Sequence, residues 1–458
     1  MKYTFSLPIA IGIAVSLFSC SNPKPPVEET QVAPEPHWSV NSTIYEVNLR
    51  QMTEEGTFKA FQEQHLDRLA DLGVEILWFM PIHPIGEKNR KGTLGSYYSV
   101  KDYQAVSAEH GTMEDFKTVV EAAHGKGMKV IIDWVANHTA WDNAWVTAHP
   151  DWYTKDSLGN LMPPVADWAD VVDLNFDNSD MREEMIQSME FWLREADIDG
   201  FRCDVAEWVP LDFWMDARAR LDSVKPIFFL AEADKAELHE AFDMTYSWGF
   251  HHVMNQVSKG EMNVQDVIDY WKGQDTLFKK QDYRLQFITN HDENSWNGTA
   301  IERMGENRKA FAVLSFTVPG MPLIYSGQEA DMDKRLEFFE KDVIDWKDYP
   351  LQDFYRNLVS IKAEHDVLFN GENGASIKFI DAANERVLVY RRANEFSELL
   401  VMLNFSDNDV SIGLEGEDFS GFYSSHIDKG SIDAQGSLHW DLPAHGYQIF
   451  ERSIDEKN

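Results

Sequence analysis

The chain has 458 residues, of which 43% are hydrophobic and 26% charged, and its formal net charge is −36 at pH 7. This composition is typical of a soluble globular protein with one large hydrophobic core and a smaller second one. The negative charge argues against nucleic acid as a partner, because binding to phosphates needs basic patches. We expect the excess acidic residues to form a solvated surface.

Residues 1–20 have the pattern of an export signal. Lys2 gives a basic start, an apolar stretch runs from Leu7 to Phe18, and Cys20 follows a small residue. The stretch is shorter than the ~20 residues that a membrane-spanning helix needs. Its end, LFSC, resembles a bacterial lipobox. This resemblance implies that Cys20 becomes the lipidated N-terminus of an exported lipoprotein, anchored to a membrane in the periplasm or at the cell surface.

The segment 21–36 is rich in Pro and Glu and has almost nothing to bury, which predicts an extended tether. The folded part is expected to begin near His37. Cys203 is the second of two cysteines, so no pair remains for a disulfide once Cys20 is lipidated.

Short apolar runs alternate with amphipathic stretches from about residue 44 to 330, which predicts parallel strands joined by helices. The eight runs are IYEVNL (44–49), EILWFM (75–80), KVIIDWV (129–135), GFRCDV (200–205), IFFLAE (227–232), AFDMTYSW (241–248), LQFITN (285–290) and PLIYSG (322–327). They predict an α/β fold, a (β/α)8 TIM barrel over residues 37–365. One connecting helix is indicated by the apolar spacing of Phe116, Val119, Val120 and Ala123, with Gly125 and Gly127 ending it.

Two further units are predicted beside the barrel. A small subdomain, at about 139–176, is inserted after the third strand and carries four tryptophans with little periodicity. Beyond residue 366 the alternating strands have no helices between them, which predicts an antiparallel β-sandwich over 366–458. The sequence has no fixed-period repeat, no phosphate-binding glycine loop and no His/Cys cluster at zinc spacing.

Several predicted strands end in polar groups, and the C-terminal strand ends are where such barrels carry their chemistry. The groups are Asp133, Asn137 and His138 at the third run, Arg202 and Asp204 at the fourth, Glu232 at the fifth, and Asn290, His291 and Asp292 at the seventh. Strand alternation directs Arg202 and Asp204 inward and Cys203 toward the helices. Singly, each acid is more often a cap or a structural acceptor. Jointly they suit retaining glycoside hydrolysis, which needs a nucleophile and a proton donor about 5–5.5 Å apart.

The strings DWVANH, GFRCDVAEW, FLAEA and FITNHD resemble the four signature regions of the α-amylase family of glycoside hydrolases, in the same order. VVDLN (171–175) and GSYYSVKDY (95–103) are similar to further family segments. The resemblance implies these roles: Asp204 as nucleophile, Glu232 as general acid/base, Asp292 as transition-state stabiliser, Arg202 as the cation that keeps Asp204 ionised, and Tyr98, His138 and His291 as contacts to the sugar. The implied activity is retaining hydrolysis of α-1,4-glucosidic bonds in starch, glycogen or maltooligosaccharides.

The resemblance also implies a calcium ion, with Asn137 and Asp173 as ligands; the sequence identifies no others, and we weigh occupancy and absence evenly. After the nucleophile the chain has Glu207 and Trp208 where family amylases commonly have Lys-His. A neopullulanase-like, α-glucosidase-like or transglycosylating enzyme acting on α-1,6 bonds or short oligosaccharides therefore stays an alternative. An inactive glycan-binding lipoprotein that uses the 15 tryptophans is a further one.

Overall fold

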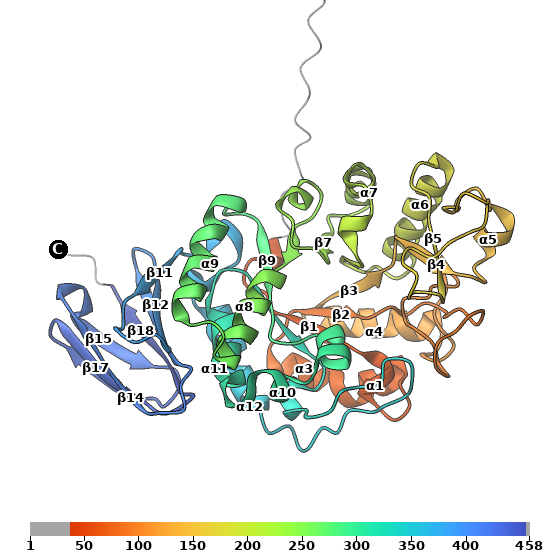
Figure 1. Ribbon diagram of the computed structural model, residues 1–458. Coiled ribbons are helices and arrows are strands. Elements are labelled where there is room, and N and C mark those ends of the chain that lie inside the picture. The colour runs from red at the N-terminus through yellow and green to blue at the C-terminus, as the bar shows by residue number, and fades with distance from the viewer. Residues whose placement is uncertain (1–36, 455–458) are drawn as a thin grey trace, which may run out of the picture. The chain divides into compact units, whose positions relative to one another are not determined.

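The computed structural model describes residues 37–454. The predicted signal peptide, Cys20 and the tether lie outside the described residues. Within them, eight parallel strands close into a barrel in the order β1-β10-β9-β8-β7-β6-β3-β2, which confirms the predicted TIM barrel (Figure 1). The strands are β1 (Ile44–Val47), β2 (Ile76–Phe79), β3 (Lys129–Trp134), β6 (Gly200–Cys203), β7 (Phe228–Ala231), β8 (Met244–Tyr246), β9 (Tyr283–Gln286) and β10 (Met321–Tyr325).

Helices surround this barrel and shield the outer face of its strands. They are α1 (Leu49–Met52), α2 (Phe58–Phe61), α3 (Asp67–Leu72), α4 (Met113–Gly125), α6 (Ser179–Glu195), α7 (Leu211–Asp222), α8 (Trp248–Lys259), α9 (Val264–Leu277), α10 (Ala300–Met304), α11 (Arg308–Thr317) and α12 (Gln352–Glu364). Among the described residues, no helix is both long and apolar enough to cross a membrane.

The predicted helix after the second strand is α4, and its ends have local causes. Thr112 and Asp115 form a reciprocal capping box at its start, and Gly127 beyond its end has a positive φ of 82°. Its buried face consists of the four predicted apolar residues. Gly125 is the last helical residue, so Gly127 supplies the left-handed conformation.

The barrel is buried on both faces. Ile44, Ile76, Trp78 and Phe228 belong to a cluster inside the barrel, whereas Phe201 and Cys203 belong to the larger cluster between strands and helices. This alternation confirms that Cys203 is a packing residue. It also places Arg202 inside the barrel, where a charged group requires charged partners.

The insertion after β3 holds β4 (His138–Ala140) and β5 (Val171–Asp173), an antiparallel pair, and the short helix α5 (Ala144–Ala148). The C-terminal part has two antiparallel sheets. One has the order β11-β12-β13-β18-β15-β16, with β11 (Ile377–Ile380), β12 (Val387–Ala393), β13 (Ser397–Asn404), β18 (Tyr447–Ser453), β15 (Gly421–Ser425) and β16 (Ser431–Ala434). The other pairs β14 (Val410–Glu415) with β17 (Ser437–Leu442).

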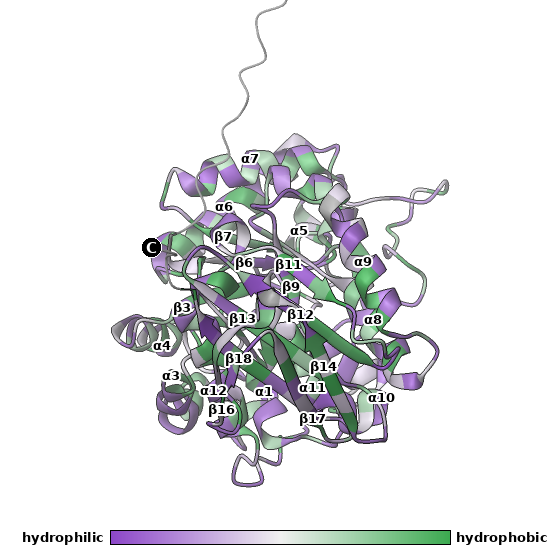
Figure 2. Ribbon diagram, turned by 90° about the vertical axis from the view of Figure 1, so that its left-hand side faces the viewer, coloured by the Kyte–Doolittle hydropathy of each residue, from purple (hydrophilic) through white to green (hydrophobic). Residues whose placement is uncertain are grey.

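Two central strands of the six-stranded sheet, β12 and β13, are buried along most of their length. Val389 and Leu400 pack toward the two-stranded sheet, while Tyr390 and Val401 join the core shared with the barrel helices. Figure 2 shows these strands in front of α11 and α12, with hydrophilic and hydrophobic stretches along them. Phe405 after β13 stacks on Phe311 of α11, with ring centroids 4.5 Å apart. The second core is thus continuous with the first.

Candidate active site

Two of the predicted catalytic acids directly follow adjacent strands. Asp204 comes after β6 and Glu232 after β7, and the last residues of these strands, Cys203 and Ala231, are paired in register. The register brings both carboxyl groups to the same edge of the barrel. Asp204 is buried, whereas Glu232 is half-buried.

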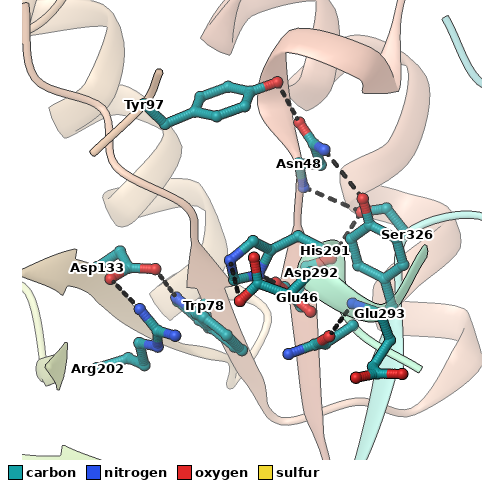
Figure 3. Close-up of polar contacts among 12 residues, drawn as sticks. Glu46, Asn48, Trp78, Tyr97, Asp133, Arg202, His291, Asp292, Glu293 and Ser326 are labelled. Atoms are coloured by element: carbon teal, nitrogen blue, oxygen red, sulfur yellow. Dashed lines mark hydrogen bonds and ion pairs between the residues drawn. The ribbon is translucent and has the colours of Figure 1, made fainter. Parts of the chain in front are cut away.

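Arg202 lies at the centre of the site and is fully buried. Its Nη1 atom is 2.8 Å from Asp133 Oδ1 and 3.0 Å from Asp204 Oδ1, and its Nη2 atom is 2.9 Å from Glu232 Oε1. Its Nε donates to Tyr246 Oη at 3.2 Å. One guanidinium group therefore contacts three carboxylates and holds the two predicted catalytic acids as neighbours (Figure 3 shows the contact with Asp133).

A second buried basic residue, His291, belongs to the same site. Its Nδ1 atom is 2.5 Å from Glu46 Oε1, and its Nε2 atom is 3.4 Å from Asp292 Oδ2 (Figure 3). Burial by itself lowers the pKa of His291, but the negative charges of Asp292 and Glu46 outweigh it and raise the pKa to about 9. His291 is therefore a buried imidazolium at neutral pH.

Tyr98 connects His291 with Asp133, a carboxylate that contacts Arg202. Its hydroxyl lies 2.7 Å from His291 Nε2 and 3.0 Å from Asp133 Oδ2, which also accepts from Trp78 Nε1 at 3.2 Å. With His291 protonated, the order of donation is fixed: His291 donates to Tyr98, and Tyr98 donates to Asp133. Both ring nitrogens of His291 thus contact protein groups, and its contact to a sugar hydroxyl stays a prediction.

Burial and the neighbouring charges together determine the protonation of the site's carboxyl groups. Burial, followed by the nearby charge of Glu232, raises the pKa of Asp204 well above the ordinary value, although Arg202 opposes the shift. Burial likewise raises the pKa of Asp133 to about 6. Arg202 lowers the pKa of Asp204, as expected, but burial and the charge of Glu232 together outweigh this effect in the free enzyme.

The turn after Asp204 is strained. Val205 is β-branched yet has φ 37° and ψ 45°, a left-handed conformation that such residues rarely adopt. In this conformation its backbone N–H donates to Glu232 Oε2 at 2.7 Å. The strain thus serves to fix the second carboxyl oxygen of Glu232.

A cavity of about 560 Å³ opens over these groups, within the range of small-molecule sites. Its lining includes the predicted residues Tyr98, His138, Asp204, Glu232, His291 and Asp292, and the aromatic residues Trp168, Trp296, Phe338 and Phe339. Burial lowers the pKa of His138 to about 4, so this ring is neutral. Trp208 is 45% exposed and stacks on Trp168 with centroids 5.2 Å apart.

The predicted calcium ligands lie close in the fold. His138, beside Asn137, is paired in register with Asp173 of β5, and the Leu174 N–H donates to the Asn137 carbonyl at 3.1 Å. Among residues 37–454, however, Asp173 belongs to no group of three or more His, Cys, Asp or Glu ligands. Calcium prefers six to eight oxygens, so Asn137 and Asp173 alone would not complete its coordination shell, and the calcium ion stays a prediction.

Sequence reasoning missed Glu46 as a member of the site. It is the third residue of β1, a strand whose four residues are all fully buried. A carboxylate in such a strand requires a buried cation, and that signal was present in the run IYEVNL. The strand predicted over 285–290 differs from the structure, because β9 spans Tyr283–Gln286 and Asp292 directly precedes the short π-helix Glu293–Asn297.

The comparisons with known proteins agree with this geometry. The family model of the alpha-amylase catalytic domain matches residues 46–159 and 165–366. Alpha-amylase MalA of Haloarcula japonica is 27% identical over 401 residues, which cover 83% of this chain and 57% of that protein, so the chain spans less than two thirds of this relative.

The chain also matches two solved structures over nearly the whole length of each. A maltogenic alpha-amylase from Thermotoga neapolitana has 30% identity and a TM-score of 0.83 over 91% of this chain and 99% of its own. An alpha-amylase from Lactobacillus plantarum has 30% identity and a TM-score of 0.81 over 90% and 98%. The chain therefore belongs to the alpha-amylase family and is a glycoside hydrolase.

Proposed function

We propose that the protein hydrolyses α-1,4-glucosidic bonds of starch, glycogen or maltooligosaccharides with retention of configuration, using Asp204 as nucleophile and Glu232 as general acid/base. The observation that carries this proposal is the shared guanidinium of Arg202, 3.0 Å from Asp204 and 2.9 Å from Glu232. Retaining enzymes need their two carboxyl groups about 5–5.5 Å apart, whereas inverting enzymes leave a wider gap for water.

In the first step, Asp204 attacks the anomeric carbon while Glu232 protonates the leaving oxygen, and the bond to the leaving sugar breaks. In the second step, Glu232 removes a proton from water, which attacks the same carbon and releases Asp204. Asp292 holds hydroxyls of the sugar as positive charge develops on the ring. Tyr98 and His138 line the cavity where that sugar would lie.

The excess of carboxylates supports this mechanism. Three carboxylates around Arg202 retain a proton more readily than isolated ones, as the raised pKa values of Asp204 and Asp133 indicate. A retaining enzyme must start with one ionised and one protonated carboxyl group. The proposed mechanism requires that this retained proton resides on Glu232 when Asp204 attacks.

Trapping of the intermediate tests the assignment. Replacing Glu232 by Gln and supplying an α-maltosyl fluoride, whose leaving group needs no acid, should accumulate a glycosylated protein. Mass spectrometry of its peptides should locate the sugar on Asp204. Label on any other residue, or none while fluoride is released, would contradict the nucleophile assignment.

A second candidate is action on short oligosaccharides or α-1,6 bonds, with transfer to another sugar as a variant. The observation that favours it is the surface next to the nucleophile, where Trp208 stacks on Trp168 and Glu207 forms an ion pair with Lys235 at 3.2 Å. An exposed aromatic platform suits a sugar acceptor on the leaving-group side. Panose, pullulan and maltotriose, compared with starch at equal concentration, separate the candidates. The remaining alternative, an inactive glycan-binding lipoprotein, requires that none of these substrates is turned over.

We also infer that the enzyme is an exported lipoprotein anchored through Cys20, in the periplasm or at the cell surface. This rests on the sequence of residues 1–20 alone. Metabolic labelling with palmitate should mark the wild type but not a Cys20→Ala variant. Equal labelling of both would contradict the anchor.

A further inference from the structure

Two histidines and a glutamate meet where the last barrel helix contacts the C-terminal sheet. His365 caps the C-terminus of α12, His426 follows β15, and Glu451 lies in β18. One potential ligand atom from each residue lies within 4.8 Å of the others, and this is the only such group of three among residues 37–454. The residues are far apart in the chain, so sequence spacing gave no sign of them.

The distances between the histidine nitrogens and the Glu451 oxygens are close to those between ligands of a zinc site. His426 Nε2 is 3.4 Å from Glu451 Oε2, and His365 Nδ1 is 3.7 Å from Glu451 Oε1. Zinc binds nitrogen and oxygen at about 2.0–2.2 Å, so neighbouring ligand atoms of a tetrahedral site stand about 3.3–3.6 Å apart. Only small side-chain movements are needed to close this group around an ion.

The rings also have unmet bonding capacity. The Nε2 atoms of both His365 and His426 are buried without a hydrogen-bond partner. Buried polar atoms are normally hydrogen-bonded, and each exception needs an explanation. A metal ion that accepts a nitrogen lone pair explains such an atom on His426, where Nε2 faces the carboxylate.

The surroundings favour a cation. Glu451 forms ion-pair contacts with these two histidines and, in the described part of the chain, with no Lys or Arg. His365 lies at the C-terminal end of α12, which carries the negative end of the helix dipole.

The three side chains differ in how accessible they are. The exposed fractions are 10% for His365, 23% for His426 and 35% for Glu451. Water can therefore reach the site and complete a four-coordinate shell. The backbone already supports this junction, because Asn357 of α12 donates to the His426 carbonyl at 3.1 Å.

We propose that His365, His426 and Glu451 bind one Zn²⁺ ion, which links α12 of the barrel to strands of the C-terminal sheet. The ligand set, two imidazoles and one carboxylate with an open fourth position, is one that zinc uses. This site is independent of the proposed catalytic mechanism. Its expected effect is on stability, since an ion that binds only the folded protein shifts unfolding to a higher temperature.

The test uses the purified, untagged full-length protein, stripped with a chelator and dialysed against ZnCl₂. We expect one equivalent of zinc to bind and the Tm to rise. His426→Gln, His365→Gln and Glu451→Gln should each weaken zinc binding at least about tenfold and lose the Tm shift. His439→Gln is a matched control, because His439 is exposed and lies 3.7 Å from Glu415 without a third ligand. Asp204→Asn should bind zinc as the wild type does, which would exclude Asp204 as a ligand of the ion.

Co²⁺ in place of zinc provides a reading that does not depend on the variants. A four- or five-coordinate cobalt site gives strong visible absorption bands, and the wild type and His439→Gln should both show them. The absence of these bands, or equal zinc affinity in wild type and His426→Gln, would overturn the proposal. In that case the three residues are an ion-pair cluster only.

Discussion

Glu46 and His291 form a buried ion pair, and replacing Glu46 should change the pH dependence of the activity. Replacing Glu46 by Gln keeps the side-chain shape but removes one of the two negative charges that raise the pKa of His291 to about 9. With Asp292 left, we expect a pKa of about 7. At pH 8 a histidine with a pKa of about 9 is about 90% protonated, and one with a pKa of about 7 only about 10%.

Because protonated His291 donates to Tyr98 and thereby orders Asp133, kcat/KM should follow this protonation. We expect Glu46→Gln to lower kcat/KM about tenfold at pH 8 and less than about twofold at pH 6. Initial rates on a 4-nitrophenyl α-maltotrioside between pH 5 and pH 10 measure the profile. Glu329→Gln is the control, since Glu329 is equally buried but contacts Tyr45 and Arg68.

The pH dependence of the unfolding free energy is a second measurement on the same ion pair. A histidine whose folded pKa is raised stabilises the protein fully below its ordinary value of 6.5, and this stabilisation is lost as the pH rises through about 9. The difference in unfolding free energy between wild type and Glu46→Gln should therefore shrink over that window. A high-pH decline of kcat/KM that is unchanged in Glu46→Gln, or that shifts equally in Glu329→Gln, would contradict the role of protonated His291.

Three further predictions concern the strained turn at Val205, the stacked Trp208 and Trp168, and the calcium ion. Val205→Gly relieves a left-handed strain, so the unfolding free energy in urea should rise by about 1 kcal/mol while kcat falls; lower stability with unchanged kcat would contradict this. Trp208→Ala should raise KM for maltotriose severalfold with kcat nearly unchanged, since it removes stacking beside Trp168, and a loss confined to kcat would count against the platform. Exhaustive dialysis against EGTA should leave activity at 25 °C intact, because Asp173 is a single carboxylate; loss restored by CaCl₂ but not ZnCl₂ would establish a calcium site.

The barrel could be predicted because each of its strands contains an apolar run, and a barrel surrounded by helices buries such strands on both faces. All eight predicted runs overlap a barrel strand, and the Cys203 packing position follows from alternation alone. The strand ends were less accurate. β9 stops at Gln286, six residues before Asp292, because hydrogen-bonded pairing ends before the chain reaches the cavity.

Site residues within local sequence motifs could be predicted, whereas contacts between residues far apart in the sequence could not. Asp204 and Glu232 follow their strands as expected. The partner of His291 comes from the first strand, and the three residues at the α12 junction come from three elements. The net pKa shift of Asp204 could not be predicted, because it depends on burial and on the position of Glu232 as well as on Arg202, and only the three-dimensional arrangement supplies these.

The most direct test of the central claim is proton NMR of the anomeric signals while the purified protein digests maltoheptaose, with Asp204→Asn in parallel. The proposed mechanism predicts that shorter maltooligosaccharides appear first as α-anomers and that the variant is silent. First products in the β-anomeric form, or undiminished activity of Asp204→Asn, would contradict it.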